Sequence, residues 1–376
     1  MLGRLAMVAA CGTMLLLAGC TPAPTAPVHA EQAVATPDAT PVDVAPDQAA
    51  VVAGDYGPAG SADPAAGLPT VGETLDEAPV GVVRPTAKGA VVGDGTPESC
   101  TAGALAEAVR GGGVIRFDCG DHHAIVLEET LTVCNTVGCR DGAKALEAVR
   151  IDGGGAITLA GAHALTLVYA NACDPALGEL DGACEGRATP HLTLEDLTLI
   201  DGAALPLGDT FDLNGGGAVA MRGGRLSIVD SFVSGNRCTE GEDQAGGAVQ
   251  VRDMSVPVEV RGSTFAANSC ALGGAIAAIG APVTVVGSSL VDNDATVAGG
   301  ALHARGTTQD VSVAVSTVAG NVAPSGAGID YAVPDGTLTV RDSRVAGNVA
   351  DKPSGTAHAG IATDSGRLEV ARTTTD

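Results

Sequence analysis

The stretch GGAIAAIGAPVTVVGSSLVDN, residues 273–293, is repeated in recognisable form along the second half of the chain. Each copy opens on a glycine-rich tetrapeptide and ends on an Asn at the close of a second signature. The first apolar residues of successive copies, at 219, 249, 276, 302, 329 and 361, lie 30, 27, 26, 27 and 32 residues apart. A period of this length predicts a solenoid.

Within each copy the apolar residues alternate with polar ones, as at Val283 and Val285 or at Leu338 and Val340. Alternation of this kind is typical of a β-strand with one buried face. No copy holds ten residues with helical spacing. The solenoid is therefore expected to be all-β.

Two polar residues recur at fixed positions in every copy. Equivalent residues of neighbouring parallel strands stack about 4.8 Å apart, so their side chains can hydrogen-bond along the stack. We expect the Asn column to form an inward ladder at a turn, with a structural role. The columns are Asn236, Asn268, Asn293, Asn321 and Asn348, and Ser231, Ser263, Ser288, Ser316 and Ser343.

The pairing of Gly-Gly-Ala-aliphatic with Phe-x-x-Asn resembles the repeats of polymorphic outer-membrane proteins, and FAAN at 265–268 matches that signature. The other copies keep the Asn but have Val or Leu in place of Phe. The wider resemblance, over roughly residues 99–376, is to right-handed parallel β-helix surface proteins of bacteria. It implies that fold, but no single activity, because the fold hosts adhesins, polysaccharide lyases and glycoside hydrolases alike.

The first twenty residues have the pattern of an export signal. Arg4 precedes an apolar run, and LAGC at 17–20 resembles a lipobox, in which Cys20 is diacylated and becomes the mature N-terminus. Thr21, in place of Asp, resembles lipoproteins sent on to an outer membrane where the organism has one. We therefore expect residues 1–20 to be a lipoprotein signal peptide and the protein to be exported and lipid-anchored at the cell envelope.

A proline-rich segment follows the signal. Residues 21–97 hold 12 of the chain's 20 prolines, with Ala, Thr and Asp between them. Such a composition buries too little apolar area to offset the entropy of ordering. Residues 21–95 are expected to be a disordered acidic linker, and no later apolar run is long enough to span a bilayer.

The folded domain is expected over residues 96–376. The segment 99–113 places apolar residues on one helical face before three glycines, and it resembles the N-terminal capping helix of secreted β-helix proteins. At the other end the second signature restarts at Leu368, whereas its Asn would fall at position 378. An incomplete last coil would expose strand edges and apolar side chains, so self-association is expected there.

Ten cysteines are present, and eight remain once Cys11 and Cys20 are set aside. Cys238 and Cys270 each lie two residues after a ladder Asn, so they share one position in adjacent coils and are expected to form a disulfide. The others are expected to pair with their nearest neighbours, and the absence of CxxC disfavours zinc. These six are Cys100, Cys119, Cys134, Cys139, Cys173 and Cys184.

The chain carries 44 acidic and 20 basic residues, a net charge of −24. This excess argues against nucleic acid and anionic membrane surfaces as partners, and it favours solubility at a cell surface. Two acidic loops, 173–184 and the insertion after Asn236, leave calcium as an alternative, but neither matches a calcium-binding motif. No cofactor or metal is therefore expected.

The resemblance implies that any chemistry lies in an exposed groove along one strand column, because β-helix enzymes act there, and the outward residues after each glycine signature form such a column. There the register predicts that His303, Arg305 and Asp330 lie on adjacent coils and form a basic stripe with Arg222 and Arg252. A carboxylate beside His or Arg can act as base and charge stabiliser in eliminating or hydrolysing an acidic glycan. The same residues are also expected of an ordinary solvated face. Trp is absent, with 3 Tyr and 4 Phe, which disfavours tight glycan binding.

The sequence thus favours a lipid-anchored bacterial surface protein with a non-enzymatic role in adhesion or envelope interaction, with a glycan or a surface protein as its partner. The alternative is a polysaccharide lyase or glycoside hydrolase that uses His303, Arg305 and Asp330. A calcium-stiffened spacer is a third hypothesis.

Overall fold

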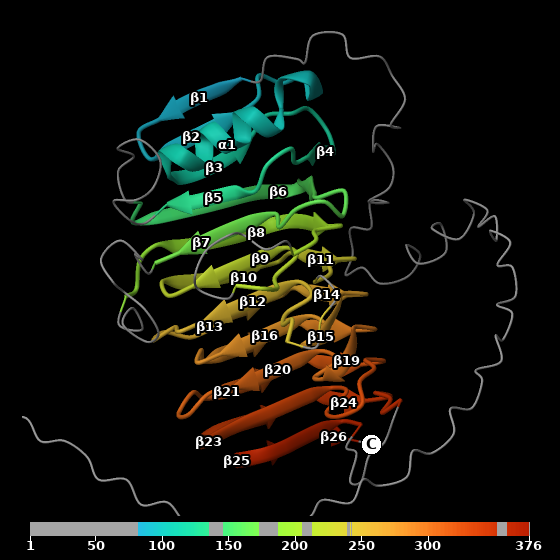
Figure 1. Ribbon diagram of the computed structural model, residues 1–376. Helices are drawn as coiled ribbons and strands as arrows, with labels where there is room; N and C mark the ends of the chain where they lie inside the picture. The colour runs from blue at the N-terminus through green and yellow to red at the C-terminus, as the bar shows by residue number, and fades with distance from the viewer. Residues whose placement is uncertain are drawn as a thin grey trace, which may run out of the picture. The chain divides into compact units, whose positions relative to one another are not determined.

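The computed structural model describes residues 82–134, 146–172, 187–204, 213–238, 241, 243–351 and 359–375. This part of the chain is a parallel β-helix, in which 24 strands form one sheet that winds coil upon coil (Figure 1). The pairing of β1(Val83–Thr86) with β2(Gly89–Val92) is antiparallel, and the other pairings in the sheet are parallel. The expected signal peptide and Cys20 lie outside the described residues.

Three strands in each coil form three stacks, which we call A, B and C. Stack A consists of β5(Leu131–Cys134), β7(Val168–Asn171), β9(Val219–Arg222), β12(Val249–Arg252), β16(Ile276–Ile279), β20(Leu302–Arg305) and the first parts of β23(Ile329–Arg341) and β25(Ile361–Ala371).

Stack B consists of β2, β3(Gly113–Phe117), the first parts of β6(Ala148–Ala160) and β8(His191–Ile200), β10(Arg225–Val229), β13(Val258–Arg261), β17(Val283–Val286), β21(Val311–Ala314) and the last parts of β23 and β25. Stack C consists of β4(His123–Val126), the last parts of β6 and β8, β11(Phe232–Ser234), β14(Thr264–Ala266), β18(Ser289–Val291), β22(Thr317–Ala319), β24(Arg344–Ala346) and β26(Thr374–Thr375).

The apolar residues of the repeat form the core. Val283 and Val285 point inward and are buried, and each pairs in register with the equivalent Val311 and Val313 of the next coil. Because identical positions stack directly on one another, the core is continuous along the solenoid axis. The alternation in the sequence therefore predicts correctly which residues point inward.

Each coil turns its corners with single residues in the left-handed conformation. Between stacks B and C this position is held by Asp196, Asp230, Gly262, Gly287, Val315, Asp342 and Arg372, with φ between 46° and 61°. Gly, Asp and Asn enter this region most readily, whereas a β-branched residue is strained there. A second such corner immediately precedes each ladder Asn, at Gly235, Ala267, Asp292, Gly320 and Gly347.

The Asn ladder is present as predicted. The Nδ2 of Asn268 donates to Oδ1 of Asn293 at 3.0 Å, and the backbone N of Asn268 donates to the same oxygen at 3.0 Å. Asn293 repeats both bonds to Asn321, at 2.9 Å each. Each side chain also donates to a strand carbonyl, as Asn293 does to Phe265 O at 3.1 Å. The ladder thus satisfies buried polar groups where the chain turns.

The Ser column forms a second ladder at the corner between stacks B and C. Ser288 N donates to Ser316 Oγ at 3.2 Å, and Ser316 N donates to Ser343 Oγ at 3.1 Å. Each hydroxyl donates in turn to the carbonyl two residues earlier, as Ser316 does to Ala314 O at 2.7 Å. Both ladders link successive coils independently of the β-sheet hydrogen bonds.

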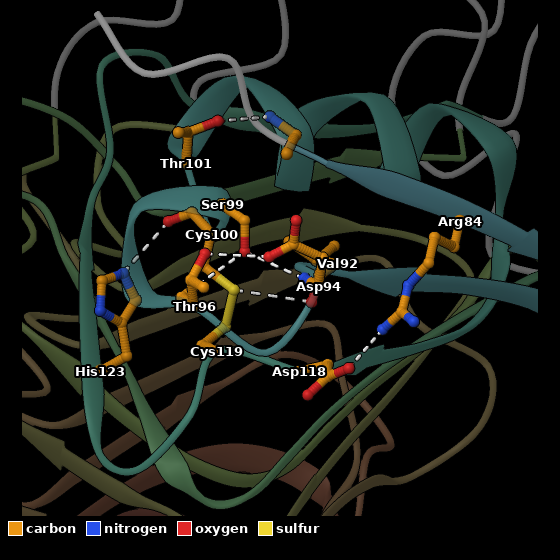
Figure 2. Close-up of a disulfide and its surroundings, with 11 residues drawn as sticks. Arg84, Val92, Asp94, Thr96, Ser99, Cys100, Thr101, Asp118, Cys119 and His123 are labelled. Carbon is orange, nitrogen blue, oxygen red and sulfur yellow. Dashed lines mark hydrogen bonds and ion pairs between the residues drawn. A yellow bond between two sulfur atoms is a disulfide. The ribbon is translucent and has the colours of Figure 1, made fainter.

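The N-terminal end of the solenoid is covered by α1(Ala102–Gly111), which packs against β2 and β5. The Thr101 hydroxyl caps this helix by accepting from Ala104 N at 3.2 Å. A disulfide joins Cys100, just before the helix, to Cys119, after β3, with their Cα atoms 5.7 Å apart (Figure 2). The expected helical cap is therefore present.

The boundary of the fold differs from the expected one. Strands β1 and β2 lie within residues that the composition assigned to the linker, and β2 pairs in parallel with β3. Within the described residues, the strands therefore begin at Val83, before Thr96. The hairpin was hard to predict because prolines lie on both sides of it in the sequence and Pro85 lies on β1 itself. Among the described strands β1 pairs only with β2, and such an edge strand tolerates proline.

The Cys238–Cys270 disulfide is present where the repeat register placed it, with the Cα atoms 5.1 Å apart. The expected pairs Cys134–Cys139 and Cys173–Cys184 involve residues outside the described part. At the other end of the solenoid, Leu368 and Val370 of β25 stack on Leu338 and Val340 and are 42% and 45% exposed. Self-association at this end stays a prediction.

No helix within the described ranges is long and apolar enough to cross a membrane.

Candidate functional site

Two of the three predicted catalytic residues are in direct contact. His303 on β20 and Asp330 on β23 occupy paired positions of stack A, and His303 Nδ1 lies 2.7 Å from Asp330 Oδ2. Each side chain is only 6% exposed. The register thus brings the two groups together as expected, but it does not bring them to the surface.

The turn that precedes each stack A strand covers this pair. Gly299 and Gly326 have φ of +69° and +52°, and a Cβ on either would lie 2.8 Å from His303 Cβ or 2.9 Å from Asp330 Cβ. Only glycine permits an approach this close. The expectation of an exposed outer column is therefore wrong, because the glycine turns fold back over it.

The other members of that column are buried as well. Gln250 is fully buried, donating through Nε2 to Asn214 Oδ1 at 2.8 Å and accepting from Gly215 N at 3.0 Å. Ala277, which lies beside His303, is also buried. Burial therefore removes the side chains of this column from the surface that a substrate polymer could contact.

Arg305 takes no part in the pair. It is exposed at the end of β20, where the register places Ile279 and Ala332 on either side. Within the described part of the chain, no hydrogen bond or ion pair joins it to His303 or Asp330. The three residues therefore do not converge on one point.

The predicted basic stripe is also interrupted. Arg222 is 1% exposed, and its Nη2 lies 2.6 Å from Asp253 Oδ2. The carboxylate neutralises this guanidinium beneath the surface, whereas Arg305 lies exposed two coils beyond Arg252. These arginines thus form no continuous cationic face.

Metal binding finds no support in the described residues, which contain no group of three or more His, Cys, Asp or Glu side chains placed to hold an ion. The acidic loop 173–184 lies outside them. The part of the insertion after Asn236 that is described includes Asp243, whose carbonyl accepts from Asn214 Nδ2 at 2.8 Å.

A surface pocket of about 440 Å³ lies where stack A turns into stack B, a position that the sequence analysis did not single out. We call it the Pro282 notch. It forms because the turn 280–282 is shorter than the turns 253–257 and 306–310 of the coils on either side. Its lining is Met254, Ser255, Pro257, Pro282, Val283, Thr284, Thr308, Gln309, Asp310 and Ser312.

Hydrogen bonds hold one wall of the notch in place. The Gln309 Oε1 accepts from Thr307 N at 3.0 Å and Thr308 N at 3.1 Å, and the Gln309 carbonyl accepts from the Tyr331 hydroxyl at 3.0 Å. Asp310 Oδ1 accepts from Thr337 N at 2.8 Å. Burial, with the nearby Asp310 carboxylate, raises the pKa of Tyr331 to about 12. These hydrogen bonds therefore hold the chain of this wall in place both before and after Gln309.

A row of hydroxyls leads out of the notch along the outer face of stack B. Thr284, Ser312 and Thr339 are in register on three successive coils and are half-buried. Val286 lies beside them in the next outward column, where its neighbour Ala314 is buried. We call Thr284, Ser312, Thr339 and Val286 the neutral strip, since none of these four residues carries a charge.

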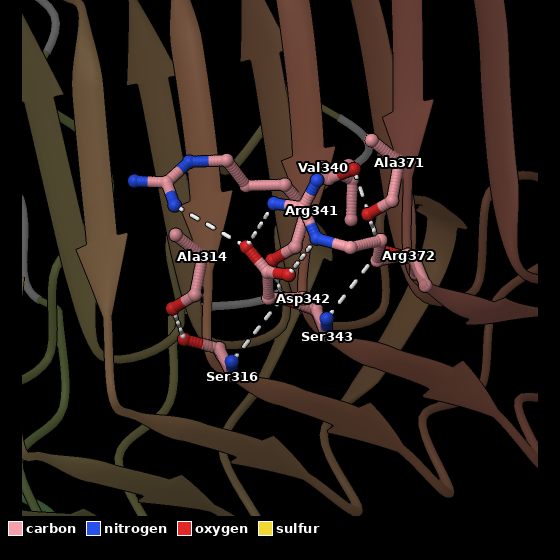
Figure 3. A network of polar contacts seen from close by, with 9 residues as sticks. Ala314, Ser316, Val340, Arg341, Asp342, Ser343, Ala371 and Arg372 are labelled. Atoms are coloured by element: carbon pink, nitrogen blue, oxygen red, sulfur yellow. Dashed lines mark hydrogen bonds and ion pairs between the residues drawn. The ribbon is translucent and has the colours of Figure 1, made fainter.

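Charged residues border the strip, and those at its C-terminal end neutralise one another. Asp342 accepts from Arg372 Nη2 at 2.8 Å and from Arg341 Nη1 at 3.3 Å (Figure 3). The hydrogen bond from Arg372 holds the pKa of the Asp342 carboxyl below its usual range. At the other end, Glu259 pairs in register with Thr284, and its carboxylate lies 3.5 Å from Arg261 Nε.

The chain matches no protein-family model, no curated protein and no solved structure.

Proposed function

We propose that this chain is a lipid-anchored bacterial cell-surface protein whose β-helix has a non-enzymatic role in adhesion or envelope interaction. The anchor rests on the lipobox-like LAGC at 17–20, and the two disulfides fit an exported protein. The observation that carries the non-enzymatic role is the burial of the His303–Asp330 pair beneath Gly299 and Gly326.

A general acid or base must come within hydrogen-bond reach of the proton that it transfers. In this fold His303 and Asp330 reach each other, while the backbone turns separate them from solvent. Hydrolysis or elimination of an acidic glycan would also need cationic groups near the substrate, whereas Arg222 is buried against Asp253. The pair therefore supports a structural role better than a catalytic one.

The anchor is tested by expressing the full chain in a bacterium with an outer membrane and labelling it with a clickable fatty acid. We expect label on the wild type, none on Cys20→Ala, and release of that variant from the membrane fraction. Equal labelling of both would overturn the lipid anchor. Digestion of the wild type by protease added to intact cells is the expected sign of surface exposure, and full protection would contradict it.

The non-enzymatic role is tested with the full chain and a panel of acidic and neutral polysaccharides, by following reducing ends and unsaturated products. We expect no release of either over a buffer control. Release of product by the wild type would overturn the proposal. Loss of that release in Arg305→Ala, which alters only an exposed side chain, would assign it to stack A.

A further inference from the structure

We infer that the Pro282 notch and the neutral strip bind a linear, uncharged glycan that runs along the solenoid axis. The inference rests on the proposed surface role and names the class of partner. It concerns stack B and the turn that leads into it, not the stack A residues predicted to be catalytic.

The lining of the notch has the chemistry that a sugar requires. Side chains of Ser255, Thr284, Thr308 and Ser312 offer hydroxyls that both donate and accept, and Asp310 offers carboxylate oxygens that accept. Pro257, Pro282 and Val283 supply apolar surface for the C–H faces of a pyranose ring. A concave site with a few convergent polar groups among apolar ones is the usual form of a small-ligand site.

Charge decides against an acidic glycan. Asp310 is the one ionisable residue in the lining of the notch, and its carboxylate would repel uronates and sulfates. The neutral strip itself holds no cation, and the chain as a whole has a net charge of −24. Arg261 and Arg341 lie in register at its two ends. Each of them lies beside a carboxylate, of Glu259 and Asp342 respectively, which offsets its charge. A neutral polymer with many hydroxyls experiences no such repulsion.

The regular spacing of hydroxyls along the neutral strip suits a polymer better than a single sugar. Thr284, Ser312 and Thr339 stand on consecutive coils, so one hydroxyl recurs about every 4.8 Å along the axis. A sugar unit in an extended glycan advances by a similar length. Successive units therefore meet equivalent groups, and binding should strengthen with chain length.

An extended peptide fits this face less well. Peptides that join a β-sheet pair with the free backbone groups of an edge strand. Strands β17 and β21 are each paired on both sides, so their backbone groups are already bonded to neighbouring coils. The outer face of these strands therefore presents side-chain hydroxyls to a ligand, and hydroxyls favour a sugar.

The lack of aromatic side chains in the lining of the notch indicates that the glycan binds weakly. None of the residues lining the notch is aromatic, so stacking on a sugar ring contributes nothing there. The fixed wall at Gln309 limits the entropy lost on binding. We expect a dissociation constant of roughly a millimole per litre for short oligomers, with tighter binding as the chain lengthens.

The test uses the full chain and β-1,4-linked oligomers of glucose, mannose and N-acetylglucosamine, from disaccharide to hexasaccharide, with binding followed by calorimetry or by ligand-observed NMR. We expect at least one series to bind with an affinity that rises with length. Oligogalacturonate of the same length is expected not to bind. Absence of binding in all three neutral series, or tighter binding of oligogalacturonate, would overturn the inference.

The double variant Thr284→Val/Ser312→Ala removes two hydroxyls and keeps the shape of the strip. We expect it to weaken binding at least fivefold. Ser289→Ala/Thr317→Val is the matched control, since the same two residue types pair in register on the outer face of stack C. Equal weakening by both variants would overturn the assignment to the strip. A failure of this test leaves the proposed surface role in place, since that role fails instead on polysaccharide turnover or on loss of the lipid anchor.

Discussion

His303 Nδ1 and Asp330 Oδ2 lie 2.7 Å apart in a pair from which solvent is nearly excluded. The contact joins two adjacent coils on the outer side of stack A. Because both groups are desolvated, each depends on the other for its polar partner. The pair is therefore expected to act as a coupling between coils.

Each member of the pair should be costly to remove alone, because its buried partner then loses its polar contact. Asp330→Ala strands the buried imidazole, and we expect a loss of about 3 kcal/mol in the free energy of unfolding. His303→Ala strands the carboxylate at a similar cost, and the double variant should lose less than the sum of the two. Denaturant unfolding measures all three.

Arg305→Ala is the control, because Arg305 is exposed and, among the described residues, no hydrogen bond or ion pair joins it to the pair. Its effect should stay within about 0.5 kcal/mol, as for most surface substitutions. Additive losses in the double variant would contradict the coupling.

The Asn ladder should be most sensitive in its interior. Asn293→Ala removes two hydrogen bonds accepted from Asn268 and two donated, to Asn321 Oδ1 and Phe265 O. The partners stay buried, so we expect a loss of about 4 kcal/mol in the free energy of unfolding.

Asn348→Ala is the matched control at the last position of the ladder. There the side chain accepts from Asn321 N at 3.1 Å and from Asn321 Nδ2 at 2.9 Å, donates to Val318 O, and is 7% exposed. We expect a smaller loss there, measured by denaturant unfolding under the same conditions. An equal effect at both positions would contradict the idea that bonds along the column add to one another.

The ladders, the core and the Cys238–Cys270 disulfide could all be predicted because the coils stack in parallel and in register. Under that geometry, residues with the same place in the repeat become neighbours, so a column of Asn in the alignment is a column in space. Cys238 and Cys270 follow by the same step.

The burial of the outer column could not be predicted in this way. The alternation of apolar and polar residues predicts the side of the strand on which His303 lies. It does not predict that the backbone at Gly299 folds back over that side. The signal was present in the repeat, since a glycine opens each copy where the backbone makes its close approach. Glycines that recur in register can thus mark a close approach of the backbone as well as the period of the repeat.

The Pro282 notch was missed for a different reason. It depends on the difference in length between the turn 280–282 and its neighbours 253–257 and 306–310, not on any residue in one copy. An alignment of copies treats such differences as noise in the spacing. On the surface of a solenoid they determine where hollows form.

Val315 is strained at its corner, and relieving the strain should stabilise the protein. It has φ of +54° and is 60% exposed, whereas Gly287 and Asp342 hold this position in the adjacent coils. A β-branched side chain is unfavourable in the left-handed region, which Asn tolerates. Val315→Asn should therefore raise the free energy of unfolding by about 1 kcal/mol.

The control is Val297→Asn, at an exposed position within β19(Asp294–Ala298). There the backbone is extended, and exchanging a β-branched residue for Asn should lower stability. Thermal unfolding of the two variants and the wild type gives the comparison. A fall in melting temperature with Val315→Asn would show that the side chain contributes packing that outweighs the strain.

Tyr331 should make the fold sensitive to alkali. Its pKa is raised from 10.0 to about 12 by burial, with the Asp310 carboxylate adding to the effect. The folded state thus holds the phenol proton more tightly than the unfolded chain does. The resulting stability is fully present below pH 10 and is lost as the pH rises through about 12.

Tyr331→Phe removes this titration. At neutral pH the variant should lose about 1 kcal/mol, because the Gln309 carbonyl loses the hydrogen bond from the hydroxyl. Between pH 10 and 12 its stability should then fall less steeply than that of the wild type. Denaturant unfolding at a series of pH values measures both effects, and the ultraviolet absorbance of tyrosinate follows the ionisation itself.

Tyr169→Phe is the control for tyrosine ionisation elsewhere in the solenoid, since Tyr169 lies on β7, far along the stack from β23. Equal slopes for Tyr331→Phe and the wild type between pH 10 and 12 would mean that the Tyr331 proton is not linked to folding. A shallower slope only in Tyr331→Phe ties alkaline stability to the wall of the Pro282 notch, because the hydroxyl bonds to Gln309.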